Sequence, residues 1–139
     1  MYKVALRQGP SRPPTPDQML HYAAVKVSDL ERSGRFYDSL LAPNGWRRQD
    51  APANSVSWGF IKAEFFIEQA DDSPRPGYGL ISFPAKSIPA VKASYESGLA
   101  NGGKSVAEPG SAPAFGPGNY CCRLTDPDGY LVEVCVAHN

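Results

Sequence analysis

Glu133 is the residue of this 139-residue chain that most clearly indicates chemistry, because it interrupts an apolar segment, LVEVCV (131–136). If this segment is a strand, its side chains alternate between two faces, and Val132, Val134 and Val136 share the face that helices would cover. Glu133 then points to the opposite, concave face, where a carboxylate can ligate a metal or act as a general base. An ordinary solvent-facing residue of an open sheet is the other interpretation.

Arg123 and His21 are two further residues whose positions indicate ligand chemistry. Arg123 precedes the turn DPDG (126–129), and alternation along 120–125 sends it toward the same cavity as Glu133. A guanidinium there could anchor a carboxylate or a phosphate; a surface arginine is the alternative. His21 opens a short alternating segment, and its imidazole could serve as a metal ligand, as a general base near neutral pH, or as a hydrogen-bonded structural residue.

The elements that must position these residues begin at His21. HYAAVKV (21–27) predicts a strand, and SDLERSGRFYDSLLAPNG (28–45) predicts a helix with a capping box formed by Ser28 and Glu31. Turn-rich linkers then separate three short strand candidates, near residues 45–48, 55–60 and 64–68. The turn DPDG itself is interpreted as structural, without chemistry.

The same order of elements occurs a second time. GLISF (79–83) predicts a strand, and SIPAVKASYESGLANGG (87–103) predicts a helix that Ser87 opens and two glycines close, Gly102 and Gly103. Further strands are expected around Lys104 and over 119–125 and 131–136. An offset of 59 residues superposes three pairs of helix positions: Ser28 on Ser87, Phe36 on Tyr95 and Leu40 on Leu99. This pattern predicts two tandem βαβββ units, with a single α+β sandwich containing two similar helices as the alternative.

The charge balance and the lengths of the apolar runs limit the classes of partner that we expect. Fourteen basic and fourteen acidic side chains cancel, without a basic patch, so we expect no nucleic-acid partner. The apolar runs fall far short of the ~20 residues that cross a bilayer, so we expect no membrane partner and a soluble, cytoplasmic protein. The three cysteines, Cys121, Cys122 and Cys135, lie in strand-like runs and are expected to be reduced core residues.

Two segments lack periodicity. Residues 1–18 contain four prolines and are expected to be an extended or disordered leader, so that the domain proper covers 19–139. Its two modules are expected at about 19–70 and 77–137. The loop AEPGSAPAFGPGNY (107–120) is expected to be either a lid over the cavity or a passive surface excursion.

The strand and helix HYAAVKVSDLERSGRFY, together with the closing DPDGYLVEV, resemble the vicinal oxygen chelate superfamily over about residues 19–136. This superfamily includes glyoxalase I, bleomycin- and fosfomycin-resistance proteins and extradiol dioxygenases. The resemblance implies an α+β fold in which two βαβββ modules form a curved mixed sheet around a cavity, with the helices on the outer face. It also implies a small-molecule ligand and a homodimer.

The resemblance further implies up to four metal-ligand slots. His21 and Glu133 match two of them, while Leu80 and Phe66 fill the other two by the repeat offset. Two donors do not make a tight site for a divalent metal, whether zinc, nickel, manganese or iron. Glu68, two residues beyond Phe66 on the same strand face, could supply a third ligand, and His138 is a further candidate.

Two functions from different classes follow. The first is a metal-dependent lyase or dioxygenase in which His21, Glu133 and Glu68 hold the metal and Glu133 takes part in catalysis. The second is a metal-free protein that binds or sequesters a small molecule. In both, the cavity would be lined by Arg123 and by the apolar residues Phe66, Leu80, Trp58 and Phe60, which could otherwise be ordinary core. True glyoxalase I activity is not expected, and a cavity filled by side chains is the remaining, inert alternative.

Overall fold

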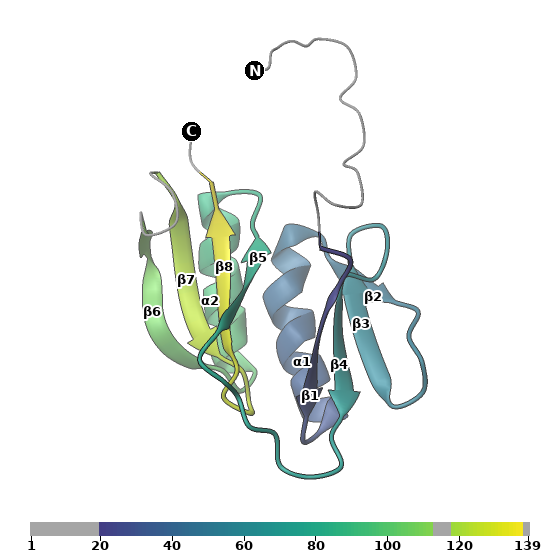
Figure 1. The fold of residues 1–139 in the computed structure, drawn as a ribbon. Helices are drawn as coiled ribbons and strands as arrows, with labels where there is room; N and C mark the ends of the chain where they lie inside the picture. Colours follow the sequence, from purple (N-terminus) through teal and green to yellow (C-terminus); the bar gives the residue numbers. More distant parts are fainter. Residues whose placement is uncertain (1–19, 113–117, 138–139) are drawn as a thin grey trace.

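The computed structural model describes residues 20–112 and 118–137 (Figure 1). The predicted leader, residues 1–18, lies outside the described residues, as does His138. The first module contains β1 (Ala23–Val27), α1 (Leu30–Leu41), the 3-10 helix η2 (Ala42–Asn44), β2 (Arg47–Gln49), β3 (Ser55–Gly59) and β4 (Phe65–Gln69). The second contains β5 (Leu80–Pro84), α2 (Ile88–Ala100), β6 (Lys104–Ser111), β7 (Tyr120–Thr125) and β8 (Leu131–Val136).

The two modules have the same topology. The strand order is β1-β4-β3-β2 in the first sheet and β5-β8-β7-β6 in the second. In each sheet the first strand of the module pairs in parallel with the last, and the remaining pairs are antiparallel. The predicted α+β fold of two βαβββ units is therefore confirmed. The described residues form two separate four-stranded sheets, with β1 and β5 each at an edge.

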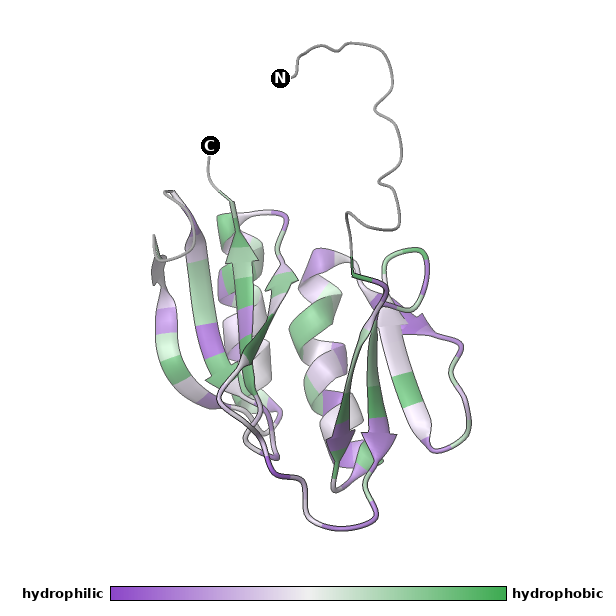
Figure 2. Ribbon diagram, in the orientation of Figure 1, coloured by the Kyte–Doolittle hydropathy of each residue, from purple (hydrophilic) through white to green (hydrophobic). Residues whose placement is uncertain are grey.

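Each helix packs on the sheet of its own module, and the two helices also pack against each other (Figure 1). Gly98 of α2 permits this close approach, because a Cβ atom at that position would lie 3.2 Å from Leu40 of α1 and 3.2 Å from Leu124 of β7. Figure 2 shows hydrophobic residues along β8 and α1 and a largely hydrophilic segment joining the modules. Phe83 of β5 links the cores, since its ring contacts Tyr37 and Phe65 of the first module.

The helix ends combine local and distant contacts. Asp29, and not Ser28 as predicted, caps α1 and accepts a hydrogen bond from the Arg32 amide. Ser28 instead donates to Asp128, 100 residues away, so its hydroxyl makes a long-range hydrogen bond and does not cap the helix. Both ends of the second helix are as predicted. Ser87 caps α2, and after its last turn Gly102 adopts φ +100° while the Gly103 amide donates to the Gly98 carbonyl.

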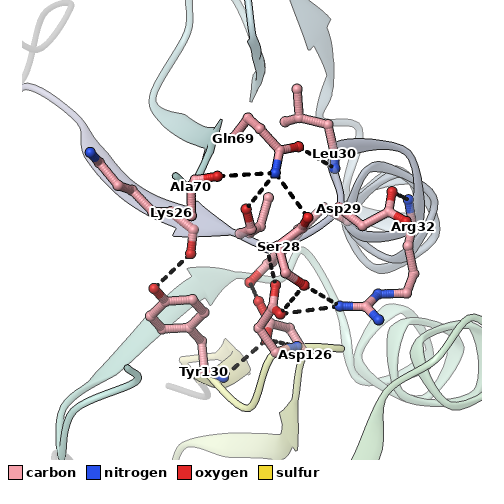
Figure 3. A network of polar contacts seen from close by, with 12 residues as sticks. Lys26, Ser28, Asp29, Leu30, Arg32, Gln69, Ala70, Asp126 and Tyr130 are labelled. Carbon is pink, nitrogen blue, oxygen red and sulfur yellow. Dashed lines mark hydrogen bonds and ion pairs between the residues drawn. The ribbon is translucent and has the colours of Figure 1, made fainter. Parts of the chain in front are cut away.

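A polar network joins the first module to the turn at 126–129 (Figure 3). Arg32 contacts Asp128 at 3.1 Å, and the Tyr130 hydroxyl donates to the Lys26 carbonyl at 2.7 Å. From β4, Gln69 donates to the Ser28 carbonyl at 2.8 Å. The turn therefore ties the second module to the start of α1, which extends its predicted structural role.

Asp126 and Tyr37 form the buried part of this junction, where the tyrosine hydroxyl donates to the carboxylate at 2.7 Å. Burial raises the pKa of the Asp126 carboxyl, although hydrogen bonds from Tyr37 and from the Asp128 and Tyr130 amides act in the opposite direction. Burial and the adjacent carboxylate together raise the pKa of Tyr37 well above its usual value. The hydrogen bond between the two groups therefore joins α1 to the turn at 126–129 inside the core.

Two expectations are corrected. Cys121 and Cys135, predicted to be reduced, are joined by a disulfide, because β7 and β8 place them directly opposite each other. Cys122 points to the other face and is an unpaired, buried core residue, as predicted. The predicted loop 107–120 begins later than expected, since residues up to Ser111 extend β6 across two register shifts. Over the described ranges, every helix is too short or too polar to serve as a membrane span.

Candidate functional site

Four side chains from β7 and β8 form a compact group on the face of the second sheet that points away from α2. Arg123 lies opposite Glu133 in the antiparallel register, and Cys121 lies opposite Cys135. The intervening residues point to the other face, where Cys122, Leu124, Val132 and Val134 are fully buried in the core. We call Cys121, Arg123, Glu133 and Cys135 the quartet.

Among the described residues, two side chains donate to Glu133, Arg123 from within the quartet and Ser82 from outside it. The Ser82 hydroxyl of β5 donates to Glu133 Oε1 at 2.6 Å, and Arg123 Nε donates to Glu133 Oε2 at 3.0 Å. The carboxylate is nearly buried, with a side-chain exposure of 7%, whereas the Arg123 side chain is 29% exposed. Both carboxylate oxygens are thus engaged, and the pair forms a desolvated ion pair with one end at the surface.

Arg123 has binding capacity beyond this pair. A guanidinium carries five N–H donors, and within residues 20–112 and 118–137 the contact with Glu133 is made through Nε. The terminal nitrogens of the partly exposed side chain can therefore donate to a bound oxyanion. Because the hydrogen bond to Glu133 holds Nε in place, the guanidinium is already oriented before a ligand binds.

His21, Glu68 and Glu133 are not gathered into one group of donors. His21 is exposed just before β1, and its ring lies 5.9 Å from that of Tyr22. Glu68 is exposed on β4, opposite Lys26. Among the described residues, the group of three or more potential metal donors within 4.8 Å of one another consists of Cys121, Glu133 and Cys135. The nitrogen and oxygen donor set expected from the sequence is therefore not assembled within a single chain.

The predicted apolar lining residues are distributed over different environments. Phe66 is half-buried on β4, where its ring packs edge-on against Tyr22 at 5.4 Å. Leu80 is half-buried on β5, opposite Leu131 of β8. Trp58, in contrast, lies in the core and is 1% exposed.

Trp58 is held there by contacts on both sides. Its ring stacks on Phe65, and its indole N–H donates to Asp38 at 2.9 Å. Burial opposes ionisation of Asp38, but hydrogen bonds from Arg48 and Trp58 outweigh it and lower the pKa of this carboxyl. Trp58 therefore anchors α1 to the first sheet, and Phe60, which follows it closely, is 66% exposed.

A cleft of about 190 Å³ lies where the two modules meet. Aromatic and aliphatic side chains make up most of its lining, with polar groups at His21, Glu64 and Ser82. Its aromatic lining residues are Tyr22, Trp46, Phe65 and Phe83. Ser82 is the link between this cleft and the quartet, because it lines the cleft and also donates to Glu133.

The sequence analysis missed Ser82 and the pairing of the cysteines. Ser82 reaches Glu133 only because β5 and β8 pair in parallel, with these two residues in register, and nothing local in the sequence reports that pairing. The cysteine pairing did leave a signal. Counting outward equally from Asp128, the centre of the five-residue connection 126–130, brings Arg123 opposite Glu133 and Cys121 opposite Cys135.

Comparison with known proteins gives consistent similarities, although no family model matches the chain. A lactoylglutathione lyase of Haemophilus influenzae is 27% identical over 124 residues, which cover 84% of this chain and 90% of that protein. A lactoylglutathione lyase of Arabidopsis thaliana is 28% identical over 126 residues, but the match spans only 42% of its length. A crystal structure of a glyoxalase/bleomycin resistance protein from Albidiferax ferrireducens superposes with a TM-score of 0.75 and 27% identity, over 84% of this chain and 97% of that one.

Proposed function

Because this chain belongs to the vicinal oxygen chelate superfamily, we propose that it binds a small molecule bearing a carboxylate or phosphate group at the quartet and the adjoining cleft. The observation that carries the proposal is the ion pair of Arg123 with Glu133, which leaves the outer part of the guanidinium at the surface. The oxyanion of the ligand binds to the Arg123 terminal nitrogens. The apolar part of the ligand occupies the cleft lined by Trp46 and Phe83.

A divalent-metal-dependent lyase or dioxygenase is the second candidate, favoured by the relatives that are named lactoylglutathione lyase. It requires His21, Glu68 and Glu133 to act as ligands of zinc, nickel, manganese or iron. These donors do not converge within one chain. Metal-free binding is therefore the better supported function, and we derive no catalytic step through a metal.

The proposal includes a homodimer in the cytoplasm. Several large apolar side chains near the first module are exposed, which favours burial against a second copy of the chain. The exposed fractions are 82% for Leu20, 57% for Tyr22, 66% for Phe60 and 83% for Ile61. Sedimentation analysis of the full chain tests this part of the proposal, and a monomer at all concentrations would contradict it.

The binding function is tested by calorimetric titration with a panel of small aromatic carboxylates and phosphate monoesters. Arg123→Met is expected to weaken binding roughly 10- to 100-fold, since a charge-assisted hydrogen bond is lost. Arg35→Met is the matched control, because Arg35 is a surface arginine with 61% side-chain exposure and only a 4.0 Å contact to Glu31. Equal binding by wild type and Arg123→Met would contradict the proposal.

Elemental analysis of protein purified without a metal-affinity tag separates the two candidates. Under non-reducing conditions the metal-free function predicts no stoichiometric divalent metal. A near-stoichiometric metal that disappears in a His21→Ala, Glu133→Ala double variant would instead establish the metal-dependent candidate.

A further inference from the structure

We infer that reduction of the Cys121–Cys135 disulfide converts part of the quartet into a binding site for a thiophilic divalent cation of the zinc class. The ligands are the two thiolates and the Glu133 carboxylate. This site differs from the His21, Glu68 and Glu133 set, because two of its three ligands are sulfur atoms from adjacent strands.

The three ligands are already together in the folded chain. One ligand atom from each of Cys121, Glu133 and Cys135 lies within 4.8 Å of the other two. The register of β7 and β8 maintains this arrangement, since both cysteines occupy directly opposed positions with a Cα–Cα distance of 4.1 Å. Glu133 precedes Cys135 by two residues and therefore lies on the same face of the same strand.

The donor types indicate the class of cation. Two thiolates favour a soft or borderline cation such as zinc over magnesium or calcium, and zinc accepts sulfur and carboxylate oxygen together. Three protein ligands leave a fourth tetrahedral position open, as in zinc sites that bind an exchangeable molecule. A divalent cation, two thiolates, the Glu133 carboxylate and the Arg123 guanidinium sum to zero charge, so the occupied site needs no counterion.

The groups that would orient the Glu133 ligand are also present. A ligating carboxylate is usually held by hydrogen bonds to neighbouring groups, which fix its orientation. Glu133 already accepts hydrogen bonds from Ser82 and from Arg123. Each carboxylate oxygen has two lone pairs, so Glu133 can ligate a cation while it keeps these two partners.

A dithiol is the reductant that opens the Cys121–Cys135 disulfide. The dithiol transfers two electrons and two protons to the disulfide, which yields two protein thiols, and is itself oxidised to a disulfide. Binding of the cation then displaces the two thiol protons into solvent. In a reducing compartment the dithiol form predominates, whereas oxidation removes two of the three ligands and closes the site.

Cobalt(II) titration of the full-length chain tests the inference. The protein is reduced with a dithiol, transferred to reductant-free anaerobic buffer, and titrated while the thiolate-to-cobalt charge-transfer absorption is recorded. We expect one cobalt per reduced chain with this absorption, and none in protein kept oxidised. A reduced chain that lacks the absorption, or an oxidised chain that binds cobalt equally, would overturn the inference.

Variants assign the ligands. Cys121→Ser and Cys135→Ser are expected to lose the charge-transfer absorption, and Glu133→Gln to weaken cobalt binding. Cys122→Ala is the control that keeps it, because Cys122 is buried on the opposite face. Persistence of the absorption in a Cys121→Ser, Cys135→Ser double variant would place the thiolate elsewhere and refute the site.

A measurement on wild-type protein tests the site without relying on variants that fail to fold. In reduced wild-type protein, zinc should protect both Cys121 and Cys135 from alkylation, as read by peptide mass spectrometry. Unchanged alkylation of these two residues in the presence of zinc would overturn the inference. The ligand-binding proposal is tested on oxidised protein with carboxylates and phosphate monoesters, and this inference on reduced protein with cobalt, so failure of the one is distinguishable from failure of the other.

Discussion

The ion pair of Arg123 and Glu133 makes an asymmetric prediction about stability. The Glu133 side chain is 7% exposed and the Arg123 side chain 29% exposed. Arg123→Met therefore leaves a nearly buried carboxylate with Ser82 as its remaining side-chain donor. Glu133→Gln leaves a guanidinium that water can reach. The arginine substitution should be the more damaging of the two.

The structure also sets the magnitudes. Removing one partner of a fully buried ion pair costs about 3–5 kcal/mol. The retained Ser82 hydrogen bond and the exposed end of Arg123 reduce this to ~2–3 kcal/mol for Arg123→Met and to ~1 kcal/mol for Glu133→Gln. In the double variant no charge is left buried, so its cost should be close to that of Glu133→Gln alone.

Urea denaturation of the four proteins, followed by circular dichroism, measures these free energies of unfolding. Glu68→Gln is the control on the other sheet, because Glu68 is exposed on β4 and its loss should change stability by less than ~0.5 kcal/mol. The reasoning is refuted if Glu133→Gln costs as much as Arg123→Met. Additive costs in the double variant would likewise show that the two residues do not interact.

Further predictions concern the junction, the helix cap and the core thiol. In thermal melts, Tyr37→Phe should lower the free energy of unfolding by ~2 kcal/mol, because it removes a hydrogen-bond donor from a buried carboxylate. The same substitution should raise the pKa of Asp126 further. Tyr95→Phe is the control and should cost under ~0.5 kcal/mol, because the hydrogen bond of the Tyr95 hydroxyl is exposed. Asp29→Ala should cost ~1 kcal/mol through loss of the α1 cap, and an unchanged melting temperature would contradict this assignment. Burial raises the pKa of Cys122 to about 11, so alkylation of reduced, native protein at pH 8 should spare Cys122 and reach it only after unfolding. Labelling of Cys122 in the native state would refute this prediction. Since the unfolded thiol ionises before the folded one, wild type should lose stability relative to Cys122→Ala as pH rises from 9.0 to about 11.

Local patterns in the sequence were sufficient for most of the fold. The alternation of LVEVCV predicted β8 with its observed bounds, Leu131–Val136, and the Ser87 cap and Gly102 correctly bracketed α2. These features depend on residues within a few positions of one another. The helix start at Asp29 was missed because Ser28 and Asp29 are both good caps, and the choice between them depends on Asp128, 100 residues from Ser28.

The site was harder to predict, because it too depends on contacts between residues that are far apart in the sequence. Alternation placed Arg123 and Glu133 on faces of their own strands, but their partners depend on how strands pair across the sheet. Ser82 reaches Glu133 through a parallel pairing, and a metal-ligand set containing His21 depends on how the two modules sit relative to each other. The roles of His21, Glu68, Phe66 and Leu80 in ligand or metal binding stay predictions that the proposed variants can test.

The separation of the two sheets has a consequence for how such a protein can evolve. Backbone hydrogen bonds run along each four-stranded ladder and end at β1 and β5, so a register shift in one ladder is not transmitted to the other. The second module tolerates two shifts between β6 and β7, whereas β2 and β3 keep a continuous register. Side chains on the open face of one sheet can therefore change without altering the strand register of the other sheet. Packing between α1 and α2 joins the two halves independently of the ladders.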